Sequence, residues 1–151
     1  MFAWSSRFHC LPFLHPVVTF GFNPANYSVA EGTGSVNVTL SLLSGTLDRA
    51  LSVVLETSLN DGTATGGILR VLKYNCLKPF FIFLATLDYS FASSEVIFSA
   101  TTSSQVVAMV ILEDTILESS ETINVALTSV DPAAILNPAS AVITIEDNDG
   151  K

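Results

Sequence analysis

The sequence predicts an all-β fold, an antiparallel β-sandwich of about seven to eight strands. Val, Ile, Leu, Phe, Thr and Ser dominate the middle and end of the chain, where short segments alternate between apolar and polar residues. β-Branched and aromatic residues suit pleated, half-buried strands. Turn residues separate the segments at short intervals, as in a sandwich. With 151 residues, the chain has the size of one domain.

The expected strands follow the apolar alternation. A first strand is expected in two pieces, 17–22 and 27–30, which are interrupted at Asn23-Pro24. The segment 35–43 alternates cleanly, which predicts one buried and one exposed face. The segment 105–112 is almost continuously apolar, so it is expected to be a central strand covered on both faces. The remaining strands are expected at 51–58, 95–100, 122–130 and 141–145.

The domain organisation is expected to be an N-terminal tail at 1–16 and one domain at 17–149. An atypical insertion at about 67–86 interrupts this domain and contains three of the chain's six basic residues. It has three interpretations: a genuine loop or extra strand, a gene-model artefact, or a loop that dips into a membrane. Nowhere does the chain have the roughly 18 to 20 consecutive apolar residues that cross a bilayer. No membrane span is therefore predicted within this chain.

The charge of the chain excludes some functions. It has 14 acidic and 6 basic residues, a formal net charge of −8. Such a surface repels nucleic acid and attracts cations where its carboxylates converge. Both histidines, His9 and His15, lie in the tail, and the chain has no nucleophile motif or glycine-rich phosphate loop. We therefore expect neither an enzyme nor a nucleic-acid partner.

Most of the acidic residues are expected at one end of the sandwich, because antiparallel strands alternate in direction and alternate loops share an end. Asp48 and Asp131 fall at the opposite end. Converging carboxylates repel one another and favour a counter-ion. Ca²⁺ takes roughly six to eight oxygen ligands, whereas Mg²⁺ keeps its waters and transition metals prefer His or Cys. An acidic rim without a metal remains the alternative. The acids placed at this end are Glu31, Asp61, Glu113, Asp114, Glu118, Glu121, Glu146, Asp147 and Asp149.

Five separated motifs resemble those of Calx-beta domains in order and spacing. They are Tyr27-Ser28-Val29-Ala30-Glu31-Gly32, Asn60-Asp61-Gly62-Thr63-Ala64-Thr65, Leu87-Asp88-Tyr89, the acidic stretch 112–123, and Val142-Ile143-Thr144-Ile145-Glu146-Asp147-Asn148-Asp149. The resemblance covers about 20–149 and implies an immunoglobulin-like sandwich, a fold found in sodium-calcium exchangers and in an integrin beta subunit. In that family the second motif runs almost directly into the third, so the segment at 67–86 is an insertion.

The resemblance also implies a calcium site. The residues on family ligand positions are Glu31, Asp61, Glu113, Asp114, Glu118, Glu121, Asp147 and Asp149. Asn148 stands where the strongest binders of the family have an acid, so one or two ions are expected. We expect Asp88 to cap a turn and not to bind metal.

The expected function is a calcium-binding module in cell adhesion or cell communication, with its loops at one end ordered by Ca²⁺. Its partners would be calcium ions and neighbouring repeats or other adhesion and matrix proteins, at an extracellular or cell-surface location. N-glycosylation sequons at Asn26 and Asn37 agree with that location. The alternative is a metal-independent adhesion or scaffold sandwich. A cadherin-like repeat ranks lower, because Asp48 falls at the opposite end from the other acids.

Overall fold

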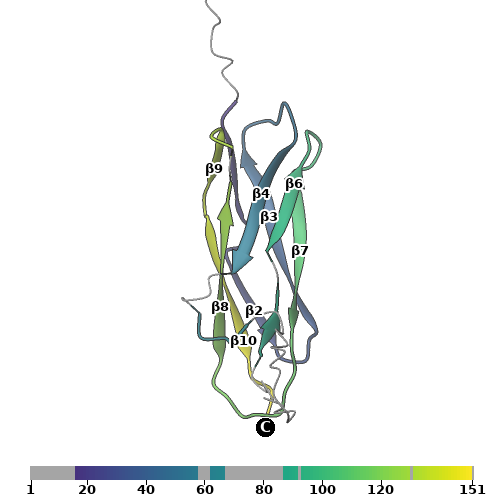
Figure 1. Ribbon diagram of the computed structural model, residues 1–151, viewed down its shortest axis with the longest axis vertical. Coiled ribbons are helices and arrows are strands. Elements are labelled where there is room, and N and C mark those ends of the chain that lie inside the picture. Colours follow the sequence, from purple (N-terminus) through teal and green to yellow (C-terminus); the bar gives the residue numbers. More distant parts are fainter. Residues whose placement is uncertain (1–15, 58–61, 67–86, 92, 130, 151) are drawn as a thin grey trace, which may run out of the picture.

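The computed structural model describes residues 16–57, 62–66, 87–91, 93–129 and 131–150, and these residues form an all-β sandwich (Figure 1). One five-stranded sheet has the order β5-β7-β3-β1-β9, and the other has the order β2-β10-β8-β4-β6. The predicted fold class is confirmed. The predicted insertion at 67–86 and nearly all of the predicted tail lie outside the described residues.

The strands are well delimited. The first sheet contains β1 (Val18–Phe22), β3 (Ser35–Ser44), β5 (Tyr89–Ser90), β7 (Ser104–Ile111) and β9 (Ala134–Leu136). The second contains β2 (Asn26–Ala30), β4 (Leu51–Thr57), β6 (Ser94–Phe98), β8 (Glu121–Thr128) and β10 (Ser140–Glu146). The described residues thus form ten strands, where seven to eight were predicted for the domain. Two of the additional strands, β5 and β9, are too short to show an apolar alternation. The described residues include no helix with the length and hydrophobicity needed to span a bilayer.

Most strand pairs are antiparallel, but two are parallel. The two pieces of the predicted first strand enter different sheets: β1 pairs with β9, and β2 pairs with β10, each in parallel. Because each piece lies beside a strand from the C-terminal part of the chain, residues near the two ends of the domain become neighbours. This arrangement brings Ala30, at the end of β2, opposite Glu146, at the end of β10.

The core lies between the two sheets and follows the predicted alternation. Val38 and Leu40 in β3 and Val53 and Leu55 in β4 are completely buried. The rings of Phe20 in β1 and Phe98 in β6 meet across the sandwich with centroids 4.6 Å apart. Large apolar side chains from both sheets therefore close one continuous core.

The prediction that 105–112 is covered on both faces was wrong. In β7 only the inward face is buried, and its buried side chains are Met109 and Ile111. Val106 and Val110 on the other face are 57% and 46% exposed. An apolar run does not distinguish a strand covered on two faces from an amphipathic strand whose outer face happens to be apolar.

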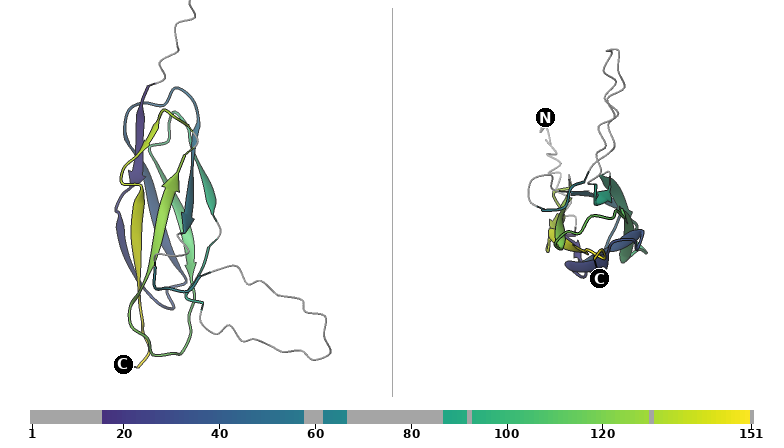
Figure 2. Two further views of the ribbon diagram at one scale, coloured as in Figure 1. Left: turned by 60° about the vertical axis from the view of Figure 1, so that its left-hand side comes forward. Right: turned by 90° about the horizontal axis from the view of Figure 1, so that it is seen from below.

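The two ends of the sandwich differ in charge. The β2–β3 turn, the β7–β8 loop and the residues after β10 meet at the lower end in Figure 1, which Figure 2 shows in two further views. We call this the acidic end. At the opposite end Arg49 donates hydrogen bonds to Asp48 at 3.4 Å and to Asp131 at 2.7 Å. Asp48 therefore lies far from the acidic end, as the alternation of strand directions predicts.

Candidate metal site

Carboxylates from four separate segments meet at the acidic end. A four-acid group (Glu31, Asp88, Asp114 and Glu118) and a three-acid group (Glu31, Asp147 and Asp149) each place one oxygen per residue within 4.8 Å of one another. Both groups contain Glu31. Such clusters of oxygen atoms from separate loops on a rigid sandwich are the kind of site that hard cations occupy.

The structure places the eight predicted ligand residues in three ways. Five of them belong to the two groups: Glu31, Asp114, Glu118, Asp147 and Asp149. Glu113 and Glu121 lie at the margin, where Glu113 accepts hydrogen bonds from Asn148 and Glu121 shares one with Asp88. Asp61 lies outside the described residues. Glu146 points elsewhere and accepts a hydrogen bond from the Ser28 hydroxyl.

Asp88 is the member of the site that sequence reasoning did not identify. Its carboxylate accepts a hydrogen bond from the Thr65 amide, which agrees with the expected capping role. The side chain is only 4% exposed, however, and it also belongs to the four-acid group. Strand direction could have identified Asp88, because the alternation of strand directions predicts that the segment 87–100 begins at the acidic end.

The β2–β3 turn holds Glu31 at the centre of both groups. Its amide donates to the Glu146 carbonyl at 3.0 Å, so β2 and β10 remain paired up to the site. The chain then turns at Gly32, whose φ of 71° favours glycine. A Cβ atom at Gly32 would lie 2.2 Å from a carboxylate oxygen of Glu113. Glycine is therefore required here both for the turn and for the approach of Glu113.

Backbone amides fix the carboxylates of the other two loops. Asp114 accepts a hydrogen bond from the Ile116 amide at 2.7 Å, which closes an Asx turn in the β7–β8 loop. One oxygen of Asp147 accepts from the Asp149 amide at 3.0 Å and the other from the Glu118 amide at 3.3 Å. Asp147 thereby joins the residues after β10 to the β7–β8 loop.

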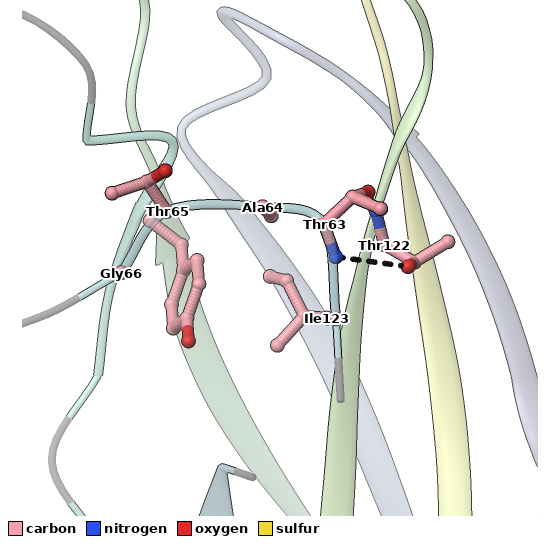
Figure 3. A pocket seen from close by; sticks show the side chains of 8 residues that line it. Thr63, Ala64, Thr65, Gly66, Thr122 and Ile123 are labelled. Carbon is pink, nitrogen blue, oxygen red and sulfur yellow. Dashed lines mark hydrogen bonds between the residues drawn. The ribbon is translucent and has the colours of Figure 1, made fainter. Parts of the chain in front are cut away.

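A short segment, Gly62 to Gly66, lies beside the start of β8, where Thr63 is next to Thr122 (Figure 3). The Thr122 amide donates to the Thr63 hydroxyl at 2.8 Å, and the Ala64 amide donates to the Thr122 carbonyl at 3.0 Å. The Asp88 amide donates to the Thr65 carbonyl at 2.9 Å. These bonds fix the backbone beside Glu121 and Asp88. The segment, the start of β8 and Tyr89 of β5 line a cavity of about 280 Å³ with no charged residue in its wall.

Burial and mutual repulsion make it unfavourable to ionise the carboxyl groups of the acidic end. Burial raises the pKa of the Glu31 carboxyl to about 7, and nearby carboxylates add to the effect. Those neighbours are Asp114, Asp147, Glu113 and Glu118. The pKa of Glu121 is raised by burial and by its hydrogen bond with Asp88. Burial also raises the pKa of Glu118, and the charge of Asp88 is the second cause. The pKa of Asp149 is raised by burial first and by the charge of Asp147 second.

Two buried oxygens at the site have no hydrogen-bond partner among the described residues. They are Oε2 of Glu31, whose side chain is 5% exposed, and Oδ2 of Asp149. Arg49 is the only Lys or Arg in the described part of the chain, and it lies at the opposite end. Leaving a buried carboxylate oxygen without a partner is costly. Among the described residues, Glu31 therefore has neither a nearby cation nor a hydrogen-bond partner for Oε2.

The raised pKa of Glu31 predicts that the metal-free domain is more stable in mild acid. A carboxyl whose pKa rises on folding stabilises the fold below its unfolded pKa, and this contribution is lost as the pH rises through the folded pKa. That window extends from about 4.5 to about 7 for Glu31. In EDTA, the melting temperature should therefore rise as the pH falls from 8 to about 5. A melting temperature that falls steadily over this range would contradict the prediction.

Comparisons with known proteins agree with this geometry. The Calx-beta domain family matches residues 15–68 and 85–149. No curated protein sequence matches the chain. Among solved structures, the apo-form Calx CBD1 domain is similar at a TM-score of 0.69 and 22% identity, covering 88% of this chain and 99% of that one. The Calx CBD2 domain is similar at 0.58 and 15%, covering 86% of each chain.

A larger structure is also similar. The calcium binding domain CBD12 of CALX1.1 aligns with a TM-score of 0.67 and 22% identity, covering 86% of this chain but only 44% of that one. At these identities the likeness establishes the fold alone. The family match, in contrast, spans well over half of the sequence and includes the segments that carry Glu31, Asp114 and Asp147. The chain therefore belongs to the Calx-beta domain family.

Proposed function

We propose that this chain is a calcium-binding module in which Ca²⁺ orders the loops of the acidic end. The observation that carries the proposal is the carboxylate of Glu31, which is almost fully buried, lacks a partner for one oxygen and is shared by both acid groups. A bound cation would compensate its charge and that of its neighbours. The β2–β3 turn, the β7–β8 loop and the residues after β10 would then be held together.

The donor set fits calcium better than other common metals. All members of the two acid groups offer carboxylate oxygens, and no His or Cys lies among the described residues. Transition metals prefer imidazole or thiolate ligands, which are absent from this part of the chain. Mg²⁺ is usually held by one or two carboxylates and keeps several waters, whereas Ca²⁺ accepts many carboxylate oxygens in flexible geometry. The bound ion would supply positive charge at the acidic end, where the described residues include no Lys or Arg.

The residues expected to hold calcium are the members of the two acid groups: Glu31, Asp88, Asp114, Glu118, Asp147 and Asp149. Asp147 also positions Asp149 and Glu118, since its two oxygens accept hydrogen bonds from their backbone amides. Glu121 supports Asp88 through their shared hydrogen bond. Asp61, which follows β4 in the sequence, is proposed as a further ligand on the family resemblance alone.

Thermal unfolding with and without calcium tests the proposal. A ligand that binds only the folded state stabilises it by about 2.7 kcal/mol at a hundredfold excess over its Kd. We therefore expect millimolar Ca²⁺ to raise the melting temperature well above its value in EDTA, and Mg²⁺ at the same concentration to raise it less. Equal melting temperatures in EDTA and in millimolar Ca²⁺ would refute the site.

We also propose that the module works in cell adhesion or cell communication beside neighbouring repeats or matrix proteins, outside the cell. The CBD12 structure supports the idea of neighbouring repeats, because more than half of that chain lies beyond the similarity. The sequon asparagines Asn26 and Asn37 have exposed side chains, as attachment of a glycan would require. Expression in a secretory system followed by enzymatic deglycosylation tests the location. A mass unaffected by deglycosylation would count against it.

A further inference from the structure

The three-residue sequence Asp147-Asn148-Asp149 places a neutral side chain between two carboxylates of the acidic end. Asn148 belongs to neither acid group. Its amide nitrogen lies 2.9 Å from the Glu31 carbonyl oxygen and 3.3 and 3.4 Å from the two carboxylate oxygens of Glu113. Glu113, which is exposed and also outside both groups, thus faces a nitrogen donor and not a cluster of oxygens.

The chemistry of the partners fixes the orientation of this amide. A carbonyl oxygen only accepts hydrogen bonds, and so does an ionised carboxylate. The group that faces both of them must therefore be the NH₂ of Asn148 and not its oxygen. A hydrogen bond to a charged acceptor is worth more than one between neutral groups. The amide thus compensates part of the charge of Glu113 without any ion.

We propose that Asn148 takes the place of a cation at the margin of the site, so that Glu113 is compensated by the chain itself and calcium binds only in the two acid groups. This inference rests on the proposed function. It assigns one ion to the four-acid group and one to the three-acid group, with Glu31 shared between them. Glu113 is then a positioning residue that anchors Asn148 through its carboxylate, and it is not a calcium ligand.

Two substitutions separate this arrangement from one in which Glu113 binds calcium. Glu113→Gln keeps an acceptor for Asn148 and removes a charge that acts on Glu31 only through space, so two ions should still bind and the affinity should fall by only about threefold. Glu118→Gln is the matched control within the four-acid group, and its affinity should fall at least about tenfold. Asn148→Asp replaces the donor with a carboxylate beside Glu113, so the number of bound ions should rise from two to three.

A measurement without calcium tests the same contact independently. In EDTA, Asn148→Asp should lower the melting temperature, because it converts a hydrogen bond into repulsion between two carboxylates. Adding Glu113→Gln to that variant restores a donor that faces the new carboxylate. The double variant should therefore melt above Asn148→Asp alone, and the double-mutant cycle should show clear coupling.

Isothermal titration calorimetry of the wild type and the three single variants, combined with melting curves of the double-mutant cycle in EDTA, decides between the two arrangements. The inference is overturned if Glu113→Gln weakens calcium binding as much as Glu118→Gln does, if Asn148→Asp still binds two ions, or if the cycle shows no coupling. If Asn148→Asp proves unfolded in EDTA, Glu113→Gln alone decides. Failure of the wild type to bind any calcium would overturn the proposed function itself, a result distinct from the other three.

Discussion

Replacing Glu31 with glutamine should have opposite effects on the metal-free and the calcium-bound protein. Glutamine has the shape of glutamate without its charge, so it removes the cost of burying that charge and the repulsion from its neighbours, which together raise the pKa of Glu31. In EDTA, the Glu31→Gln variant should therefore melt at a higher temperature than the wild type at pH 8. In calcium the order should reverse, because both acid groups lose the one carboxylate that they share.

The expected loss of calcium affinity is large. Removing one partner of a buried charge pair costs about 3 to 5 kcal/mol, and each 1.4 kcal/mol is a factor of ten in affinity. Calcium binding should therefore weaken by about a hundredfold or more, as measured by calorimetry. Glu95→Gln is the matched control, because Glu95 is exposed on β6 and belongs to neither group. Unchanged calcium affinity in Glu31→Gln would mean that Glu31 is not the shared ligand.

The convergence of the acids followed from strand direction alone. Asn148 donates a hydrogen bond to the Glu31 carbonyl although 117 positions separate the two residues, and no local sequence pattern links them. Antiparallel strands return alternate loops to one end, however, so the number of strands between two loops determines whether they meet. The same reasoning put Asp48 and Asp131 together at the opposite end, where both contact Arg49.

Other features depend on tertiary contacts that a linear pattern does not contain. The two-residue strand β5 exists because Tyr89 and Ser90 pair with β7, not because of their own alternation. Strand direction places Asp88, just before β5, at the acidic end, but its carboxylate joins the four-acid group through that pairing and through its hydrogen bond with Thr65. The outer face of β7 is apolar yet exposed, since Val106 and Val110 point away from the other sheet. Apolar character alone did not reveal which face was covered.

Truncating Phe98 should cause the largest loss of stability away from the acidic end. Its side chain is fully buried in β6 and packs against Phe20 of the opposite sheet. Phe to Ala in a core costs about 3 to 5 kcal/mol, because the apolar contacts are lost and a cavity remains. For a domain of this size that corresponds to a fall of roughly 10 to 20 °C in melting temperature. The neighbouring Ile97 is 57% exposed, so Ile97→Ala should cost far less.

The Phe98→Ala variant also separates the core from the calcium site. Phe98 pairs with Leu51 at the start of β4, whereas β4 approaches the acidic end with its last residues. Distant sites without shared partners contribute additively to stability. Calcium should therefore raise the melting temperature of Phe98→Ala by about as much as it raises that of the wild type. A much smaller calcium effect in this variant would mean that packing between the two sheets, and not the loops alone, holds the acid groups in place.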